Sequence, residues 1–162
     1  MPILIATVIA PIGAFIHLRR HPEPNTRQRV FEVYLLWWLA LAIGFSGVVG
    51  GLYHVFDGKQ IAEDIGFTRG DGGFQFENAM GDIAIGVAAL LCLRYRDPAF
   101  WLAVLIIATI QYWGDAIGHV YQWRHNGNDD PDNVGIPLVL DVLVPIVAWV
   151  LYRGATRQPD RA

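Results

Sequence analysis

Acidic and histidine side chains inside long apolar stretches are the residues of this sequence most able to carry chemistry. Placing a charged side chain at the centre of a lipid bilayer costs roughly 2.5–3.5 kcal/mol on insertion scales, so such a group usually faces a partner, a water-filled cavity or a bound ion. We therefore predict that the ionisable residues of these stretches form one site. They are Glu77, Asp82, Asp115, His119 and Asp141.

The spacing of these residues places several of them on shared helix faces. Asp115 and His119 are four residues apart, as are Asn78 and Asp82, and residues at that spacing lie on the same side of a helix. His54 follows a run of glycines, which let helix backbones approach one another, so we expect that face to meet a neighbouring helix. The glycines expected at close helix contacts are Gly44, Gly47, Gly50, Gly51, Gly81, Gly86, Gly114 and Gly118.

Carboxylates and imidazoles without a thiol are a ligand set for Fe, Mn or Zn. The candidate metal ligands are Glu77, Asp82, Asp115, His119 and Asp141. Di-iron bundles use Glu-x-x-His pairs, whereas this chain has one Asp-x-x-x-His, so its match to them is generic. A porphyrin held by His54 and His119 is a less favoured cofactor. The pattern assigns no catalytic residue.

The same residues also fit two interpretations without a bound metal. In the first, Asp115 and His119 form an internal ion pair while Asp82 and Asp141 accept hydrogen bonds, which fixes the helix register without binding anything. In the second, the Asp, Glu and His side chains form a relay that moves protons or ions.

The composition indicates a membrane protein. Hydrophobic residues make up 54% of the 162 residues and charged residues 17%, whereas soluble domains contain about 25% charged residues. The net charge is -3 and the basic residues are scattered over short loops. This pattern excludes nucleic acid as a partner, because nucleic acid requires a concentrated basic face.

Five apolar segments are long enough to cross a bilayer as helices, since a span needs about 20 residues and the backbone in lipid must satisfy its own hydrogen bonds. The predicted fold is therefore an all-α bundle of five transmembrane helices in a single domain. The segments cover residues 2–18, 30–56, 74–93, 98–123 and 134–152. The outer loop 57–73 contains a short amphipathic stretch, and it is either an exposed loop or an interfacial or re-entrant lid.

Loop charges predict the orientation of the bundle, because Lys and Arg collect on the cytoplasmic side of a membrane. Nine of the twelve basic residues fall in the loops after the first and third segments and in the C-terminal tail. The N-terminus is therefore expected outside and the C-terminus in the cytoplasm, across the inner membrane of a prokaryote. In this orientation the candidate site residues all fall in the outer half of the membrane.

Three polar motifs resemble those of a known family. They are Phe76-Glu-Asn-Ala-Met-Gly-Asp-Ile-Ala-Ile-Gly86, Gly114-Asp-Ala-Ile-Gly-His119 and Asp141-Val-Leu-Val-Pro145. The chain resembles small multi-spanning prokaryotic membrane proteins that are classed as a domain of unknown function. The resemblance covers the last four predicted helices. It implies a helical membrane bundle with Glu77, Asp115, His119 and Asp141 in its polar motifs, and it implies no activity.

Three functions are compatible with this pattern, and they leave open whether the protein is an enzyme. The first is a metal-dependent redox enzyme that acts on a small or lipid-soluble substrate. The second is an accessory subunit of a larger membrane complex of respiratory or photosynthetic type, or a homo-oligomer, in which the polar residues are structural. The third is a proton-linked transporter, which ranks last because transporters commonly contain inverted repeats and this chain shows none.

Overall fold

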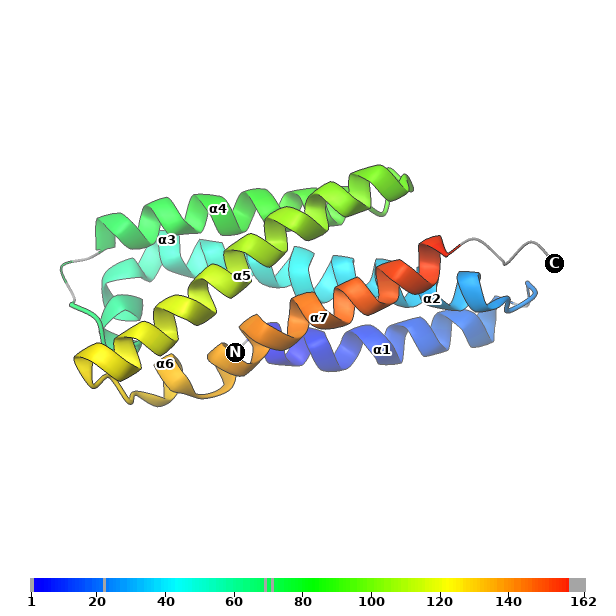
Figure 1. Cartoon of the computed structure of the whole chain (residues 1–162). Coiled ribbons are helices and arrows are strands. Elements are labelled where there is room, and N and C mark those ends of the chain that lie inside the picture. The colour runs from blue at the N-terminus through cyan, green and yellow to red at the C-terminus, as the bar shows by residue number, and fades with distance from the viewer. Residues whose placement is uncertain (1, 22, 69, 71, 158–162) are drawn as a thin grey trace.

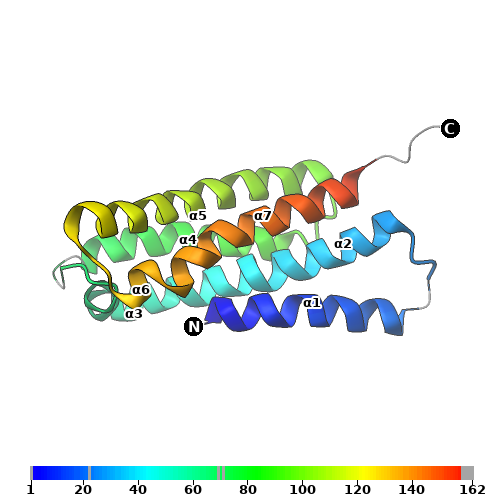
Figure 2. The ribbon, with the colours of Figure 1, turned by 60° about the horizontal axis from the view of Figure 1, so that its bottom comes forward.

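The computed structural model describes residues 2–21, 23–68, 70 and 72–157. Within these residues the chain forms a bundle of long helices joined by short loops (Figures 1 and 2). The elements are α1 (Pro2–Arg20), α2 (Arg27–Trp38), η1 (Leu39–Phe45), α3 (Ser46–Asp64), α4 (Gly72–Leu91), α5 (Pro98–Asn126), α6 (Pro131–Val134) and α7 (Ile136–Thr156). The described residues contain no strand, and the all-α prediction is confirmed.

Local sequence signals set several helix ends. The Thr26 hydroxyl caps α2 by accepting a hydrogen bond from the amide of Arg29 (3.2 Å), as Ser and Thr commonly do at this position. The Asp97 carboxylate caps α5 in the same way, with proline at the first helical position. Gly127 follows the end of α5 with a φ of 67°, in the left-handed region that favours glycine.

α2, η1 and α3 form one continuous rod, with a π-helix in its middle and a break near its end. At the end of the π-helix η1, the backbone N–H of the following residue, Ser46, is directed at the Leu41 carbonyl five residues earlier, and the Ser46 hydroxyl donates to the same carbonyl (3.0 Å). The break is at Asp57, whose angles are non-helical (φ -131°, ψ 25°). It directly follows Phe56, the end of the second predicted span.

The chain is helical again after this break, up to Asp64, within the segment predicted as an outer loop. Ala62 is fully buried there and Ile61 is half-buried, because a helix collects the apolar side chains of this amphipathic stretch on one face. The second half of the predicted loop includes Arg69 and Asp71, which lie outside the described residues. α4 begins at Gly72, inside that predicted loop.

The rod and α4 pack closely because glycines remove the side chains between them. A Cβ atom on Gly47 would lie 2.9 Å from the carbonyl oxygen of Asp82. A Cβ atom on Gly86 would lie 2.7 Å from the amide nitrogen of Val48 and 2.8 Å from the carbonyl oxygen of Gly44. The glycine face of the second predicted helix therefore meets a neighbouring helix, as expected.

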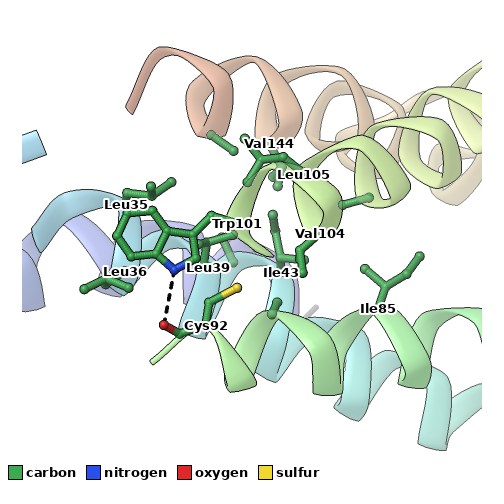
Figure 3. Packing of buried hydrophobic residues seen from close by; sticks show 14 of the residues in the cluster. Leu35, Leu36, Leu39, Ile43, Ile85, Cys92, Trp101, Val104, Leu105 and Val144 are labelled. Atoms are coloured by element: carbon green, nitrogen blue, oxygen red, sulfur yellow. Dashed lines mark hydrogen bonds between the residues drawn. The ribbon is translucent and has the colours of Figure 1, made fainter. Parts of the chain in front are cut away.

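Apolar side chains fill the bundle toward the end that carries the α4–α5 loop (Figure 3). Trp101 is 3% exposed, and its indole N–H is directed at the carbonyl oxygens of Cys92 (3.4 Å) and Tyr95 (3.1 Å). The indole N–H of Trp38 donates a hydrogen bond across the bundle to the carbonyl of Val144 (3.1 Å). Other buried members of this apolar core are Leu35, Leu36, Leu39, Ile43, Val104 and Leu105.

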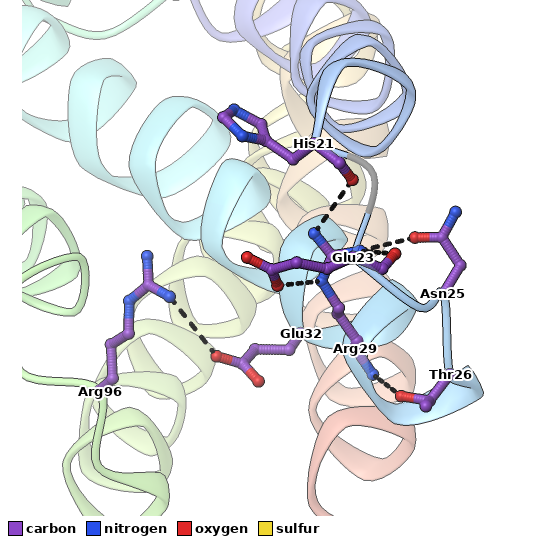
Figure 4. Close-up of polar contacts among 7 residues, drawn as sticks. All are labelled: His21, Glu23, Asn25, Thr26, Arg29, Glu32 and Arg96. Atoms are coloured by element: carbon purple, nitrogen blue, oxygen red, sulfur yellow. Dashed lines mark hydrogen bonds and ion pairs between the residues drawn. The ribbon is translucent and has the colours of Figure 1, made fainter.

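The α1–α2 loop, the α4–α5 loop and the C-terminal end of α7 lie at the same end of the bundle (Figures 1 and 2). Arg29 forms an ion pair there with Glu23 (3.1 Å) and donates to Asn25 (2.7 Å), and Arg96 pairs with Glu32 at 3.8 Å (Figure 4). The described arginines of this end, called the arginine-rich end below, are Arg19, Arg20, Arg27, Arg29, Arg94, Arg96, Arg153 and Arg157. Arg161 lies outside the described residues.

Among the described residues, four helical stretches are long and apolar enough to cross a membrane. They are Ile3–Arg20, Arg27–Asp64, Pro98–Asn126 and Pro131–Thr156. α4 is not among them, because its first half carries Glu77, Asn78 and Asp82. Large apolar side chains lie on the outer surface of the bundle, as Ile110 and Ile117 do on α5. These features support helices that cross a membrane, while the number of spans and the orientation stay predictions.

Candidate functional site

A cavity of about 760 Å³ lies near the end of the bundle opposite the arginine-rich end. It is partly open and lies where α3 and α5 end and α4 and α7 begin. These helix ends are toward the left of Figure 1. Four helices contribute predicted site residues to its wall. These residues are His54, Asp82, Asp115, His119 and Asp141.

The cavity exists because α5 diverges from α4 toward this end (Figure 1) and because small residues line the space between the helices. Gly50, Gly114 and Gly118 face the cavity, and a Cβ atom on any of them would meet no atom within 4 Å. Gly50, Gly114 and Gly118 were all expected at close helix contacts. They instead leave room in the cavity wall.

Glu77 does not line the cavity, although it was predicted to belong to the site. Its α4 neighbours Asn78 and Asp82 do line the cavity, and Glu77 is exposed to the outside. Consecutive residues on a helix are rotated by about 100° and do not share a face. The structure therefore does not bring Glu77 to the other predicted site residues.

The orientation of His119 is set by the side-chain amide of Asn133, a residue of α6 that is completely buried. The Asn133 amide nitrogen donates hydrogen bonds to the carbonyl oxygens of His119 (3.3 Å) and Asn128 (2.9 Å). The amide oxygen of Asn133 is thus the atom that faces Nδ1 of His119, at 2.7 Å. Because that oxygen can only accept, Nδ1 must carry a hydrogen and donate it.

The other ring nitrogen of His119, Nε2, lies 3.6 Å from a carboxyl oxygen of Asp141. If neither group carried a proton here, two lone pairs would face each other, so an attractive contact requires one proton on Nε2 or on the carboxyl group. His119 and Asp141 therefore form a pair able to give or take a proton at the cavity wall. The ion pair expected between Asp115 and His119 is replaced by this contact with Asp141.

Side-chain amides also hold His54 and Asp115 in the cavity wall. Nδ1 of His54 lies 2.6 Å from the amide oxygen of Gln75, which is 3% exposed. The amide nitrogen of Gln111 donates to both Asp115 (3.1 Å) and Asn78 (3.0 Å). This last contact links α5 to α4 across the cavity.

Comparison with known proteins places the chain in a family. A family model matches residues 1–161, and its description is a family of unknown function, DUF6790. The chain belongs to this family. No curated protein and no solved structure matches it. The resemblance to a family without an assigned function is confirmed, and the functional interpretation of this DUF6790 protein rests on its cavity.

Two residues that support the cavity were absent from the predicted site. Asn133 lies in the four-residue helix α6 and Gln75 lies near the start of α4, and neither has a charge or a place in a motif that marks it as functional. What marks them is that a buried amide needs hydrogen-bond partners. Because the sequence alone does not show that these two amides are buried, it could not identify them.

The described residues contain no group of three or more His, Cys, Asp or Glu side chains arranged to hold a metal ion. Both ring nitrogens of His119 already face protein partners. The geometry therefore does not support the predicted binding of Fe, Mn or Zn by Glu77, Asp82, Asp115, His119 and Asp141. The porphyrin bound by His54 and His119 stays a prediction.

The loop after α3 closes over this end through a contact at Gly66, and replacing Gly66 with alanine is expected to disrupt it. Gly66 has a φ of 77°, and an added Cβ would collide with the side-chain amide of Asn128, which donates to the Ile65 carbonyl (2.8 Å). We expect the variant to lose about 1–3 kcal/mol of stability through backbone strain and this clash, measured by thermal unfolding in detergent.

The matched control is Gly127→Ala, because Gly127 has a similar φ of 67° but no atom within 4 Å of an added Cβ. The control is expected to lose only the stability that alanine costs at a positive φ, without the clash. Equal destabilisation of the two variants would contradict the role given to the Asn128 contact.

Proposed function

We propose that this chain is an integral membrane protein with five transmembrane helices that binds a small organic molecule in the cavity at its non-cytoplasmic end. The observation that carries the proposal is the cavity itself, whose wall contains four carboxyl groups and two imidazoles. Its volume of about 760 Å³ falls within the range of roughly 300–1,000 Å³ that is typical of ligand pockets.

The fifth span in this proposal is α4. Its polar residues Gln75, Asn78 and Asp82 face the cavity, and its exposed side chains include the apolar Val87 and Leu90. Polar side chains inside a membrane usually face a bundle interior or a water-filled cavity. The polarity of α4 is therefore consistent with a membrane helix that lines a binding site.

The orientation follows from the arginine-rich end. Basic residues gather on the cytoplasmic side of membrane proteins, and the cavity lies near the opposite end of the bundle. A small molecule would thus enter from the non-cytoplasmic side or from the outer leaflet. The prokaryotic inner membrane and a larger complex or homo-oligomer stay predictions.

The apolar core favours a binding site over a proton or ion pathway. A pathway across the membrane needs polar groups or water along its length, whereas the described polar residues of the cavity lie toward one end. Between them and the arginine-rich end lie fully buried apolar side chains such as Leu35, Leu39 and Leu105. The contact between His119 and Asp141 is therefore best placed to exchange a proton with a bound molecule.

Cysteine labelling at Gly118 tests this proposal. Cys92 is the only cysteine and is fully buried, so the unaltered protein serves as a blank, and Gly118 has open space for a side chain. We expect a membrane-impermeant maleimide added to intact cells to label Gly118→Cys. A cysteine at exposed Leu93, beside the α4–α5 loop, should react only after the cells are permeabilised.

Two results would contradict the proposal. Labelling of Gly118→Cys only after permeabilisation would reverse the orientation. No labelling under either condition, in a variant that is present in the membrane, would show that small molecules do not reach the cavity.

A further inference from the structure

We propose that the ligand of this cavity is an organic cation with an apolar body, such as an alkylated amine. This inference rests on the proposed function and adds the chemical class of the ligand. It follows from the charges of the cavity wall, from a half-buried carboxyl group, Asp82, that has no hydrogen bond or ion pair among the described residues, and from the apolar side chains around it.

The cavity wall contains acidic groups and lacks strong bases. Asp82, Asp115, Asp132 and Asp141 line it, and among the described lining residues there is no lysine or arginine. The only basic side chains in the wall are imidazoles, and His119 is already matched to Asp141 at 3.6 Å. A positively charged ligand would therefore be attracted and an anion repelled.

Asp82 is the carboxyl group best placed to receive such a ligand. Asp115 accepts hydrogen bonds from Gln111 and Asp141 faces His119, whereas Asp82 has no hydrogen bond or ion pair to any described residue. Asp82 and Asp115 both line the cavity. The N–H group of a protonated amine bound there would donate a hydrogen bond to the carboxyl oxygens that Asp82 leaves without a partner.

The rest of the wall is suited to an apolar body. Ile61, Ile65 and Phe67, from the end of α3 and the following loop, are half-buried and line the cavity. Aromatic faces attract cations as well as apolar groups. A fully polar ion such as a hydrated metal would leave these side chains without a partner, whereas an alkylated amine would contact both kinds of surface.

The electrostatic preference should be large enough to measure. Opposite charges a few ångströms apart attract more strongly in a partly buried site than in bulk water, and exchanging a cation for an anion turns the attraction into repulsion. We therefore expect the rates at which a cationic and an anionic reagent react in the cavity to differ about tenfold or more, which corresponds to about 1.4 kcal/mol.

The test uses paired thiol reagents on Gly118→Cys in detergent-purified protein. One methanethiosulfonate carries a trimethylammonium group and the other a sulfonate group. Each forms a disulfide with the cysteine thiolate and releases methanesulfinate. For each variant we take the labelling rate of the cationic reagent divided by that of the anionic reagent. The value for Gly118→Cys is then divided by the value for a reference variant, Gly73→Cys. Gly73 is a suitable reference because it is exposed, has open space and does not line the cavity. We expect a normalised ratio of about ten or more.

Variants that remove one carboxyl charge then show which residue causes the faster labelling by the cationic reagent. In the Gly118→Cys background, Asp82→Asn is expected to lower the ratio several-fold, whereas Asp129→Asn should leave it unchanged because Asp129 is exposed and outside the cavity wall. Tetrapropylammonium should also slow labelling by neutral N-ethylmaleimide, and propanesulfonate should not.

The neutral maleimide separates the two proposals. If it labels Gly118→Cys readily but the normalised ratio is near one, the cavity is accessible and the inference about cations is wrong. If it fails to label a folded variant, the proposed binding function is wrong as well. Protection by propanesulfonate would indicate an anion site and would also overturn the inference.

Discussion

Replacing Gly86 with alanine is expected to destabilise the bundle by about 1–3 kcal/mol, the usual cost of overpacking a well-filled contact. The added Cβ would lie 2.7 Å from the Val48 amide nitrogen and 2.8 Å from the Gly44 carbonyl oxygen. Both are backbone atoms of the rod that packs against α4, so relief requires the two helices to separate. Thermal unfolding of purified protein in detergent would measure the loss.

The control is Gly81→Ala on the same helix. A Cβ atom on Gly81 would approach only the amide oxygen of Gln111, at an ordinary contact distance of 3.6 Å. Because alanine favours helices over glycine by about 1 kcal/mol, this variant should be as stable as the unaltered protein or more so. If Gly86→Ala were equally well tolerated, the close approach of the rod to α4 would be refuted.

The helices and the close contact between the rod and α4 were predictable because they depend on local patterns, whereas the close contact predicted for Gly114 and Gly118 was wrong. Five long apolar segments indicate helices, because in lipid or in an apolar core the backbone N–H and C=O groups can form hydrogen bonds only with each other. The face of Gly44 and Gly47 before His54 indicated a close contact, and α4 provides it. The N-cap at Asp97 followed by a proline also marked the start of α5 without knowledge of the fold.

The site was predictable as a set of residues, but its pairings were not. Spacing places Asp115 and His119 on neighbouring turns of one helix, yet the partner of His119 is Asp141 on α7. That choice depends on how α5 and α7 cross, which no local pattern specifies. Glu77 was wrongly included in the site because of its charge. It lies next to Asn78 on α4, on a helix face that is exposed to the outside.

Asn133→Asp is expected to be the most damaging conservative change at the cavity. The aspartate would keep an oxygen facing Nδ1 of His119, but it would place a second oxygen against the carbonyls of His119 and Asn128, now 3.3 and 2.9 Å from an amide nitrogen. Because Asn133 is completely buried, losing these donors should cost about 1–3 kcal/mol or more. Thermal unfolding in detergent measures this cost.

Asn126→Asp is the matched control, since Asn126 is exposed at the end of α5 and a surface change usually alters stability by less than about 0.5 kcal/mol. A second variant, Asn133→Leu, also removes the oxygen that receives the Nδ1 hydrogen. Nitrogen NMR of protein labelled at histidine should then show His119 losing its fixed tautomer. If Asn133→Leu left that tautomer unchanged, Asn133 would not be what fixes the hydrogen on Nδ1 of His119.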